Sequence, residues 1–147
     1  MINIKVKRLT ETAKIPTKAH NTDACYDLYV DGEPAAYTVI KPHEAITFNT
    51  GISTEIPEGY FAAVFARSGL GIKHNLRPSN CVGIIDADYR GEWKVALYND
   101  SNEYRTIGVG ERVAQFAILP VLETTLEEVN ELTETERGEG GFGSTGK

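Results

Sequence analysis

Three stretches of the sequence hold side chains that could act on a phosphate ester. In the first, "ARSGLG" (66–71), an apolar run leads straight into Arg67, Ser68 and Gly69. Arginine offers a forked cation, serine a hydroxyl, and glycine lets backbone N–H groups approach an oxyanion. Taken alone, this motif fits an ordinary strand-to-helix turn with a surface arginine better than it fits a binding site.

The second stretch, "NCVGIIDADYRGEW" (80–93), places Asp86 directly after two isoleucines, on a strand predicted to be largely buried. A buried carboxylate is costly unless it is paired or put to use. Asp86 is therefore a candidate general base, or a residue that orients a water molecule. A cap of the turn beside Asp88 explains it equally well. With the returning run "WKVALYN", the stretch predicts a β-hairpin with a longer loop.

The third stretch, "GFGSTGK" (141–147), has the letters that open a P-loop, with Gly141, Gly146 and Lys147 suitably spaced. A working P-loop needs a strand before it, and Ser or Thr leading into a helix after the lysine. Polar residues, not a strand, precede this stretch, and no Ser or Thr follows Lys147 in the sequence. The P-loop interpretation therefore fails. An aromatic residue, Phe142, in a glycine-rich arm suggests instead that the arm folds over a flat group.

Whole-chain composition narrows the class of protein. The 147 residues suit one domain, and a formal charge of −6 argues against non-specific binding to nucleic acid. No apolar run is long enough for a membrane span and the N-terminus lacks a signal-peptide centre, so we expect no membrane partner and a cytoplasmic location. Cys25 and Cys81 fit two buried free thiols, and scattered histidines argue against a structural metal site.

Strands must position most of these residues. Period-two alternation rich in β-branched and aromatic residues predicts short strands, separated by turn signals. The predicted strands cover 2–9, 25–30, 37–40, 45–56, 60–66, 93–99 and 112–119. Closely spaced short strands point to an all-β sandwich or barrel. One short helix is predicted within 68–76, with Ser68 as its N-cap.

The end of the chain follows a different pattern. Residues 123–134 have helical spacing at Leu126, Val129 and Leu132, although a strand followed by a polar linker fits equally. From Thr133 onward Gly, Glu, Ser and Thr dominate, and such a segment cannot offset its own ordering entropy. We therefore expect a β domain over 1–132 and a mobile arm over 133–147.

Together these stretches resemble the trimeric dUTPase family, the deoxyuridine 5′-triphosphate nucleotidohydrolases. Five ordered motifs mark that family and all five occur here in order: "ACYDLY" (24–29), "ARSGLG" (66–71), "GIIDADYRGEW" (83–93), "GERVAQFAILP" (110–120) and "RGEGGFGSTG" (137–146). Cys25, Ala66 and Gly71 depart from the usual Gly, Pro and Ala. None of these departures removes a functional side chain.

The resemblance implies a distorted jelly-roll fold with one short helix and a mobile C-terminal arm. It also implies a homotrimer in which each active site draws residues from all three chains. The implied reaction is hydrolysis of dUTP to dUMP and pyrophosphate with Mg²⁺ on the triphosphate, which lowers dUTP and supplies dUMP for thymidylate synthesis. An acidic protein can bind this anion through Mg²⁺ and a few convergent donors.

The resemblance also assigns roles to residues of the nucleoside side of the site. Asp86 activates the attacking water and contacts the 3′-OH, while Tyr89 packs on the sugar and excludes a 2′-OH. Uracil is read in a slot lined by Asn80, Gly83, Ile84 and Lys94, largely through backbone groups. A slot of this kind rejects the thymine methyl sterically and cytosine through its hydrogen-bond pattern.

Phosphate binding is assigned to other motifs. Arg67, Ser68 and Gly69 grip phosphates with Gln115 beside them, and Asp27 lies near the metal, acting through its water ligands. The arm then closes the site, with Phe142 stacked on uracil. Arg137, Ser144 and Thr145 meet the γ-phosphate, and Gly143 is a further substrate-binding residue of the arm.

Three other functions stay open at this point. dCTP deaminases, including bifunctional forms, share the fold, although "GIIDADYRGEW" matches the uracil-specific hairpin better. A binding-only role is a second alternative, because trimeric dUTPases of mobile elements can bind repressor proteins. No extra insertion between the third and fourth motifs provides a docking arm for one. A structural protein without a ligand is the third alternative, and five matched motifs argue against it.

Overall fold

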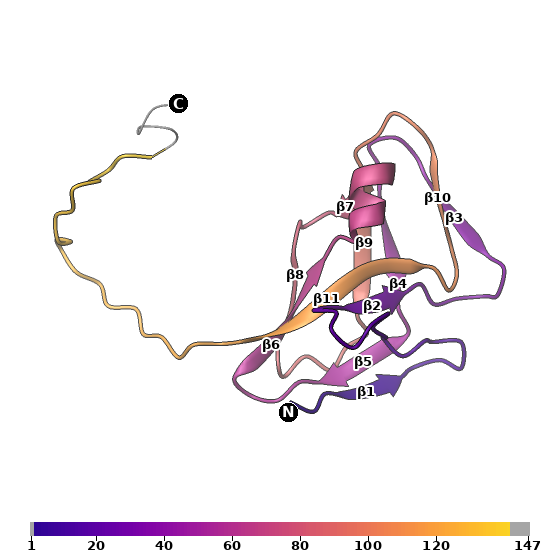
Figure 1. Ribbon diagram of the computed structural model, residues 1–147, viewed down its shortest axis with the longest axis horizontal. Coiled ribbons are helices and arrows are strands. Elements are labelled where there is room, and N and C mark those ends of the chain that lie inside the picture. The colour runs from indigo at the N-terminus through magenta and orange to yellow at the C-terminus, as the bar shows by residue number, and fades with distance from the viewer. Residues whose placement is uncertain (1, 142–147) are drawn as a thin grey trace.

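The structure is a computed structural model, and it describes residues 2–141 (Figure 1). Almost all regular structure in that range is β, which confirms the all-β prediction. The strands are β1 (Lys5–Arg8), β2 (Tyr26–Tyr29), β3 (Tyr37–Ile40), β4 (Ala45–Asn49), β5 (Ile52–Glu55), β6 (Tyr60–Phe65), β7 (Leu76–Pro78), β8 (Gly83–Ile85), β9 (Lys94–Asn99), β10 (Arg105–Gly108) and β11 (Arg112–Pro120).

Two larger sheets enclose the core. One has the strand order β2-β11-β6-β8 and the other β4-β9-β7, while β1 pairs with β5 and β3 with β10. All of these pairings are antiparallel. Inward-facing side chains of alternating strand positions fill the interior, because successive side chains point to opposite faces of a sheet. The largest fully buried apolar side chains are Trp93, Leu28, Ile40, Ile52, Leu76, Leu97 and Val113.

The helix lies between β6 and β7. It is a single π-helical turn, Gly69–Lys73, with Ser68 at the N-cap position as predicted. The Ser68 side chain makes no capping hydrogen bond, so this part of the prediction is wrong. Its hydroxyl is consequently not engaged by the helix. No helix within residues 2–141 is both long and apolar enough to cross a membrane.

The predicted hairpin over 80–99 is wrong. β8 pairs with β6, whereas β9 pairs with β4 and β7, so the two runs belong to different sheets. Residues 79–82 carry the chain from one sheet to the other, and Cys81 adopts a left-handed φ of 64° there. A sequence pattern gives the strands of such a region but not their partners, since the pairing is decided by packing elsewhere in the chain.

The predicted buried thiols also need correction. Cys81 is exposed because it lies in this connection between sheets, and Cys25 is half-buried at the start of β2. Burial raises the pKa of the Cys25 thiol, with Asp27 adding to that rise and Lys18 opposing it. This rise lowers the fraction of Cys25 in the thiolate form, which is the reactive one.

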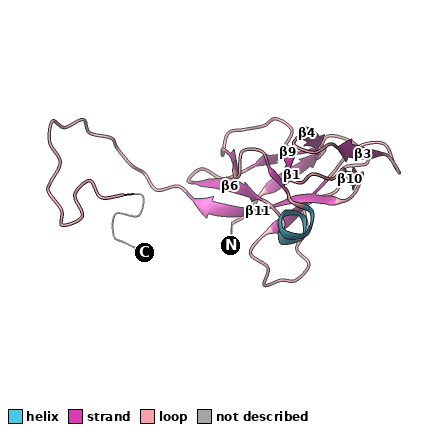
Figure 2. Cartoon of the chain, turned by 90° about the horizontal axis from the view of Figure 1, so that it is seen from above, coloured by secondary structure: helices cyan, strands magenta, loops and turns pink. Residues whose placement is uncertain are grey.

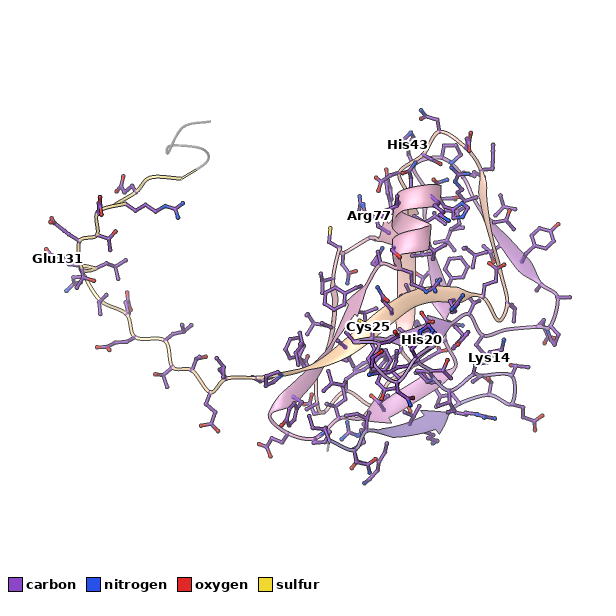
Figure 3. The ribbon with its side chains drawn as sticks, viewed as in Figure 1. Lys14, His20, Cys25, His43, Arg77 and Glu131 are labelled. Atoms are coloured by element: carbon purple, nitrogen blue, oxygen red, sulfur yellow. The ribbon has the colours of Figure 1, made fainter. Side chains whose placement is uncertain are left out.

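Neither structure considered for 123–134 occurs. β11 ends at Pro120, and residues 121–135 run without helix or strand, away from the body (Figure 2). We call residues 121–141 the C-terminal arm; Figure 3 shows Glu131 on it, far from the sheets. Leu126 is fully exposed. A short helix is marginal unless its apolar face packs, and within residues 2–141 no surface covers that face.

Candidate active site

Three neighbouring strands bring together residues of the first, second and fourth motifs. β11 lies between β2 and β6, and Gln115 faces both Asp27 and Phe65 across the sheet. Arg67 follows β6 by two residues, and its Nε donates to Oδ1 of Asp27 at 2.7 Å. The Gln115 side-chain amide donates to the Ala66 carbonyl at 2.9 Å, which fixes the backbone just before Arg67. We call this group the anion cluster.

A second arginine completes the anion cluster. Nη1 of Arg112 donates to Oδ2 of Asp27 at 3.2 Å, so one carboxylate lies between two guanidinium groups. The Asp27 side chain is only 13% exposed, and its single negative charge faces the positive charges of two arginines. Within the described range Arg67 uses only Nε for pairing, which leaves its terminal nitrogens to bind an anion. Arg112, which was assigned no role from the sequence, thus contacts the second carboxylate oxygen of Asp27.

Gly69 is not required by the fold. A Cβ added there would meet no other heavy atom of the chain within 4 Å, and its φ is not in the left-handed region. In proteins generally, glycine is also used where a ligand must approach the backbone closely, because it has no side chain. Its position directly after Arg67 and Ser68 therefore suits the predicted approach of an oxyanion.

The predicted nucleoside residues meet in one groove between β8 and β9. Asn80, Gly83, Ile84 and Lys94 all line this groove, which has a volume of about 360 Å³ and which we call the slot. β8 is an edge strand: one side pairs with β6, and no strand of the described chain pairs with the other. Unpaired backbone groups on an edge strand are free to bind a ligand.

Asp86 and Tyr89 line an adjoining pocket that shares Ile84 and Lys94 with the slot. The Tyr89 hydroxyl donates to the Glu92 carbonyl at 3.1 Å, and a Cβ on Gly91 would collide with the Tyr89 ring. Nη1 of Arg90 donates to the Ala87 carbonyl at 2.6 Å. These contacts hold the 86–92 turn in one shape around the pocket.

Asp86 is exposed, contrary to the burial predicted for it. The reason is the edge position of β8, on which Ile84 is also 55% exposed. Among the residues that the structure describes, no side chain or backbone group hydrogen-bonds to the Asp86 carboxylate. The turn is closed instead by its main chain, where the Tyr89 N–H donates to the Asp86 carbonyl at 3.2 Å. The cap interpretation therefore leaves the side chain unexplained.

The anion cluster and Asp86 lie at opposite ends of β6. Ile85 pairs with Ala62, and because the strands are antiparallel Asp86 lies one residue further on, six residues from Arg67. At about 3.3 Å per residue, this places the two groups roughly 20 Å apart along the strand. Asp86 and the anion cluster of one chain are therefore widely separated relative to the distance of about 3–3.5 Å at which reacting atoms meet.

The fifth motif is only partly described. Arg137 lies on the C-terminal arm, where its Nε donates to the Gly140 carbonyl at 2.7 Å. The other predicted residues of this motif, Phe142, Gly143, Ser144 and Thr145, lie outside the described residues. The arm itself runs away from the sheets of its own chain (Figure 1).

Comparisons with known proteins agree with these observations. The dUTPase family model matches residues 11–146. The chain is 44% identical to a deoxyuridine 5′-triphosphate nucleotidohydrolase from Nautilia profundicola, covering 99% of this chain and 100% of the relative. It is 45% identical to one from Syntrophotalea carbinolica, covering 99% of this chain and 97% of the relative.

Solved structures show the same fold. A mutant dUTPase of Staphylococcus bacteriophage 80alpha with dUpNHpp matches with a TM-score of 0.86 and 32% identity over 99% of each chain. A mutant dUTPase of phage phi11, described with a structural Mg(II) ion, matches at 0.77 and 28% identity over 88% of this chain and 97% of that one. The predicted jelly roll is thereby confirmed, and the chain belongs to the dUTPase family.

Proposed function

We propose that this chain hydrolyses dUTP to dUMP and pyrophosphate in sites shared between subunits of a homotrimer. This is the activity of the dUTPase family, and the matching relatives are named deoxyuridine 5′-triphosphate nucleotidohydrolases. The observation that carries the residue-level proposal is the unpaired Asp86 carboxylate beside a slot with a free strand edge. A dCTP deaminase is not favoured, because the matching relatives are dUTP nucleotidohydrolases.

The nucleoside end is proposed to bind against β8. Uracil enters the slot and pairs with main-chain groups of the 80–84 segment and of Lys94, while Tyr89 covers the sugar. A main-chain edge offers donors and acceptors at fixed spacing, so it favours uracil over cytosine. The fixed 86–92 turn keeps the Tyr89 ring against the position of C2′, where a ribose hydroxyl would collide with it.

At the phosphate end, Arg67 and the Ser68 and Gly69 backbone are proposed to hold the triphosphate. Asp27 keeps the Arg67 guanidinium in place through Nε, so that its other nitrogens face the anion. Gln115 holds the backbone before Arg67 through the Ala66 carbonyl. Pre-positioned cations of this kind stabilise the negative charge that develops on the transferred oxygens.

The donor set fits a magnesium ion that arrives with the triphosphate. Within residues 2–141 no three His, Cys, Asp or Glu side chains cluster as a metal cage. Mg²⁺ needs none when phosphates and waters supply most ligands. Each Asp27 oxygen accepts one arginine hydrogen bond and keeps capacity for a magnesium-bound water. When bound, the ion would neutralise phosphate charge.

Asp86 is proposed to act on the attacking water. No hydrogen bond from residues 2–141 occupies its carboxylate, so it can accept a proton from a water placed in line with the α-phosphorus. The same carboxylate contacts the 3′-OH, which fixes the sugar relative to that water. Because Arg67 of the same chain lies roughly 20 Å away along β6, the phosphates are proposed to be held by Arg67 of another subunit.

The C-terminal arm and the residues that follow it are proposed to complete the site of another subunit, with 133–147 as the lid. It leaves its own body at Pro120 and carries the exposed Leu122, Leu126 and Leu132, which favour contact with a second chain. Stacking of Phe142 on uracil and binding of the γ-phosphate by Arg137, Ser144 and Thr145 would exclude bulk water from the reaction.

Deletion of residues 137–147 tests the lid. We expect a folded trimer with kcat/KM for dUTP lowered about 10- to 100-fold, because the substrate loses positioning contacts and water enters. Light scattering establishes assembly, and a pyrophosphate assay measures turnover. Lys147→Ala is the matched control and should retain full activity. Undiminished turnover in the truncated protein would rule out a lid.

A substrate panel tests the function itself. Pyrophosphate release should be fast with dUTP and at least about 10²-fold slower with dCTP, whose base edge mismatches a hydrogen-bonding site. It should also be slower with dTTP, whose methyl group collides with the slot, and with UTP, whose 2′-OH collides with Tyr89. Removal of Mg²⁺ should lower the rate on dUTP. Ammonia release from dCTP is measured alongside. Equal activity on all four nucleotides, or deamination of dCTP, would contradict the proposal.

A further inference from the structure

An ion pair borders the turn that leads into the slot. Arg77 lies on β7, and its Nε and Nη2 contact the two carboxylate oxygens of Asp100 at 2.6 and 3.3 Å (Figure 3). The guanidinium also lies over the Tyr98 ring, 5.1 Å from its centroid. Arg77 and Tyr98 face each other across the β7–β9 pair, so the sheet register creates this stacking.

The remaining nitrogen of Arg77 points at the turn itself. Nη1 lies 3.4 Å from the Pro78 carbonyl, 3.5 Å from the Ser79 carbonyl and 4.0 Å from Sγ of Cys81. One planar guanidinium therefore joins Asp100, at the end of β9, to three successive parts of the 78–81 turn. Arginine suits this task because its donors sit in a rigid fork.

The opposite side of the same turn forms the slot. Pro78, Ser79 and Asn80 line it, together with Gly83 of β8. The turn is closed by the Cys81 N–H donating to the Pro78 carbonyl at 3.0 Å, and it is anchored to β9 by the Ser79 N–H donating to the Ala96 carbonyl at 2.8 Å. Cys81 adopts its left-handed φ at this point. A non-glycine residue in that conformation persists only where its surroundings hold it.

Global stability does not explain the pair. The Arg77 and Asp100 side chains are 40% and 42% exposed, and ion pairs at such exposure add little to the free energy of unfolding. What their contacts do fix is the path of residues 78–81 between the two sheets. The position of Asn80 relative to Gly83 and Lys94 depends on that path.

We propose that Arg77 and Asp100 are a positioning pair that holds the 78–81 turn in the shape required to bind the nucleoside. Neither side chain lines the slot, so both act through the backbone of the turn. The proposal rests on the proposed dUTP hydrolysis. Its effect falls on nucleotide binding and base selection, because the chemistry at phosphorus is carried by Asp86 and the anion cluster.

The test compares Arg77→Ala, Arg77→Lys and Asp100→Ala with the wild-type enzyme. Arg77→Ala should raise the KM for dUTP about threefold to tenfold, the loss expected for one or two hydrogen bonds, with kcat within about twofold. Selectivity for dUTP over dTTP should fall by a similar factor. Lysine can pair with Asp100 but cannot also span the turn carbonyls, so Arg77→Lys should lie between alanine and wild type.

Two further measurements separate positioning from other effects. The double variant Arg77→Ala/Asp100→Ala should be no worse than Arg77→Ala, because both changes remove one unit. Lys5→Ala is the matched control: it breaks the exposed 2.7 Å pair of Lys5 with Glu55, on strands that do not line the slot, and should leave KM unchanged.

The outcomes are distinct. Unchanged KM and selectivity in both Arg77→Ala and Asp100→Ala would overturn the proposal, as would a fall in kcat with KM unchanged. If Arg77→Ala fails to fold, Arg77→Lys and Asp100→Ala decide the question in the same assay. Wild-type turnover of dUTP is measured first. Failure of the wild-type enzyme to release pyrophosphate would contradict the proposed function, not the role of the Arg77–Asp100 pair.

Discussion

Replacing Asp86 by asparagine should abolish dUTP hydrolysis while leaving nucleotide binding intact. The amide preserves the shape of the side chain but cannot accept a proton from water. Loss of a general base typically costs about 10²–10⁴-fold in rate. We expect kcat to fall by that amount, measured as pyrophosphate release under saturating dUTP. Binding of the non-hydrolysable dUpNHpp, measured by calorimetry, should change little.

The neighbouring Asp88 provides the matched control. It is exposed on the same turn, two residues away, and does not line the pocket that contains Asp86. Asp88→Asn makes the same change in charge and should retain nearly full kcat. Substantial turnover in Asp86→Asn, or an equal loss in both variants, would show that the carboxylate next to the slot is not the base.

Mixing two inactive variants should restore activity if sites are shared between subunits. Asp86→Asn keeps Arg67, and Arg67→Ala keeps Asp86. When the two chains are unfolded together and reassembled at equal amounts, about one site in four should combine an intact Asp86 with an intact Arg67 from a neighbour. We therefore expect about a quarter of wild-type turnover from two parents that are each near background.

The structure gives this experiment its logic. Asp86 and Arg67 lie at opposite ends of β6. In a trimer of either variant alone, every site lacks one of these two groups. Arg67→Ala leaves Asp27 paired with Arg112, so the carboxylate keeps a cationic partner. A mixture of Asp86→Asn with the double variant Asp86→Asn/Arg67→Ala is the control and should stay inactive. Background activity in the first mixture, with trimers present, would place both residues in one chain's site.

The sequence predicted the strands well wherever alternation was long and undisturbed. The run 37–40 matches β3 in full, and 60–66 and 112–119 match β6 and β11 within one residue. These strands bury one face or both, so hydrophobic pattern and final structure agree. β7 and β10 were not predicted, because Leu76–Pro78 has three residues, one a proline, and Arg105–Gly108 has one buried apolar side chain.

Pairing and exposure were harder to predict than the strands themselves. Nothing local in 80–93 shows that β8 joins β6 instead of returning along β9, and this choice made Asp86 exposed. The helical spacing of Leu126, Val129 and Leu132 was misleading for a related reason. Apolar spacing indicates that a face is to be covered, but not whether its own chain covers it.

The site was predicted more completely than the fold because motifs fix residue identities. Asn80, Gly83, Ile84 and Lys94 were assigned to one slot and do line one groove. Asp27 and Gln115 lie on adjacent strands, and Arg67, just after the next strand, contacts Asp27. Their roles remain predictions. The contacts of Arg112 with Asp27 and of Arg77 with the turn depend on register and on a sheet-to-sheet crossing, which no single motif specifies.

The free edge of β8 has a consequence for evolution. A base that is recognised by main-chain atoms is shielded from most point mutations, because exchanging a side chain leaves the N–H and carbonyl groups where they were. Gly83 is the exception, since a Cβ there would lie 3.2 Å from the Val64 Cβ and force the two strands to shift. A heritable change of base preference would therefore have to move this backbone, either through an insertion or deletion in 79–85 or through a substitution that displaces the turn, such as one at Gly83 or Arg77.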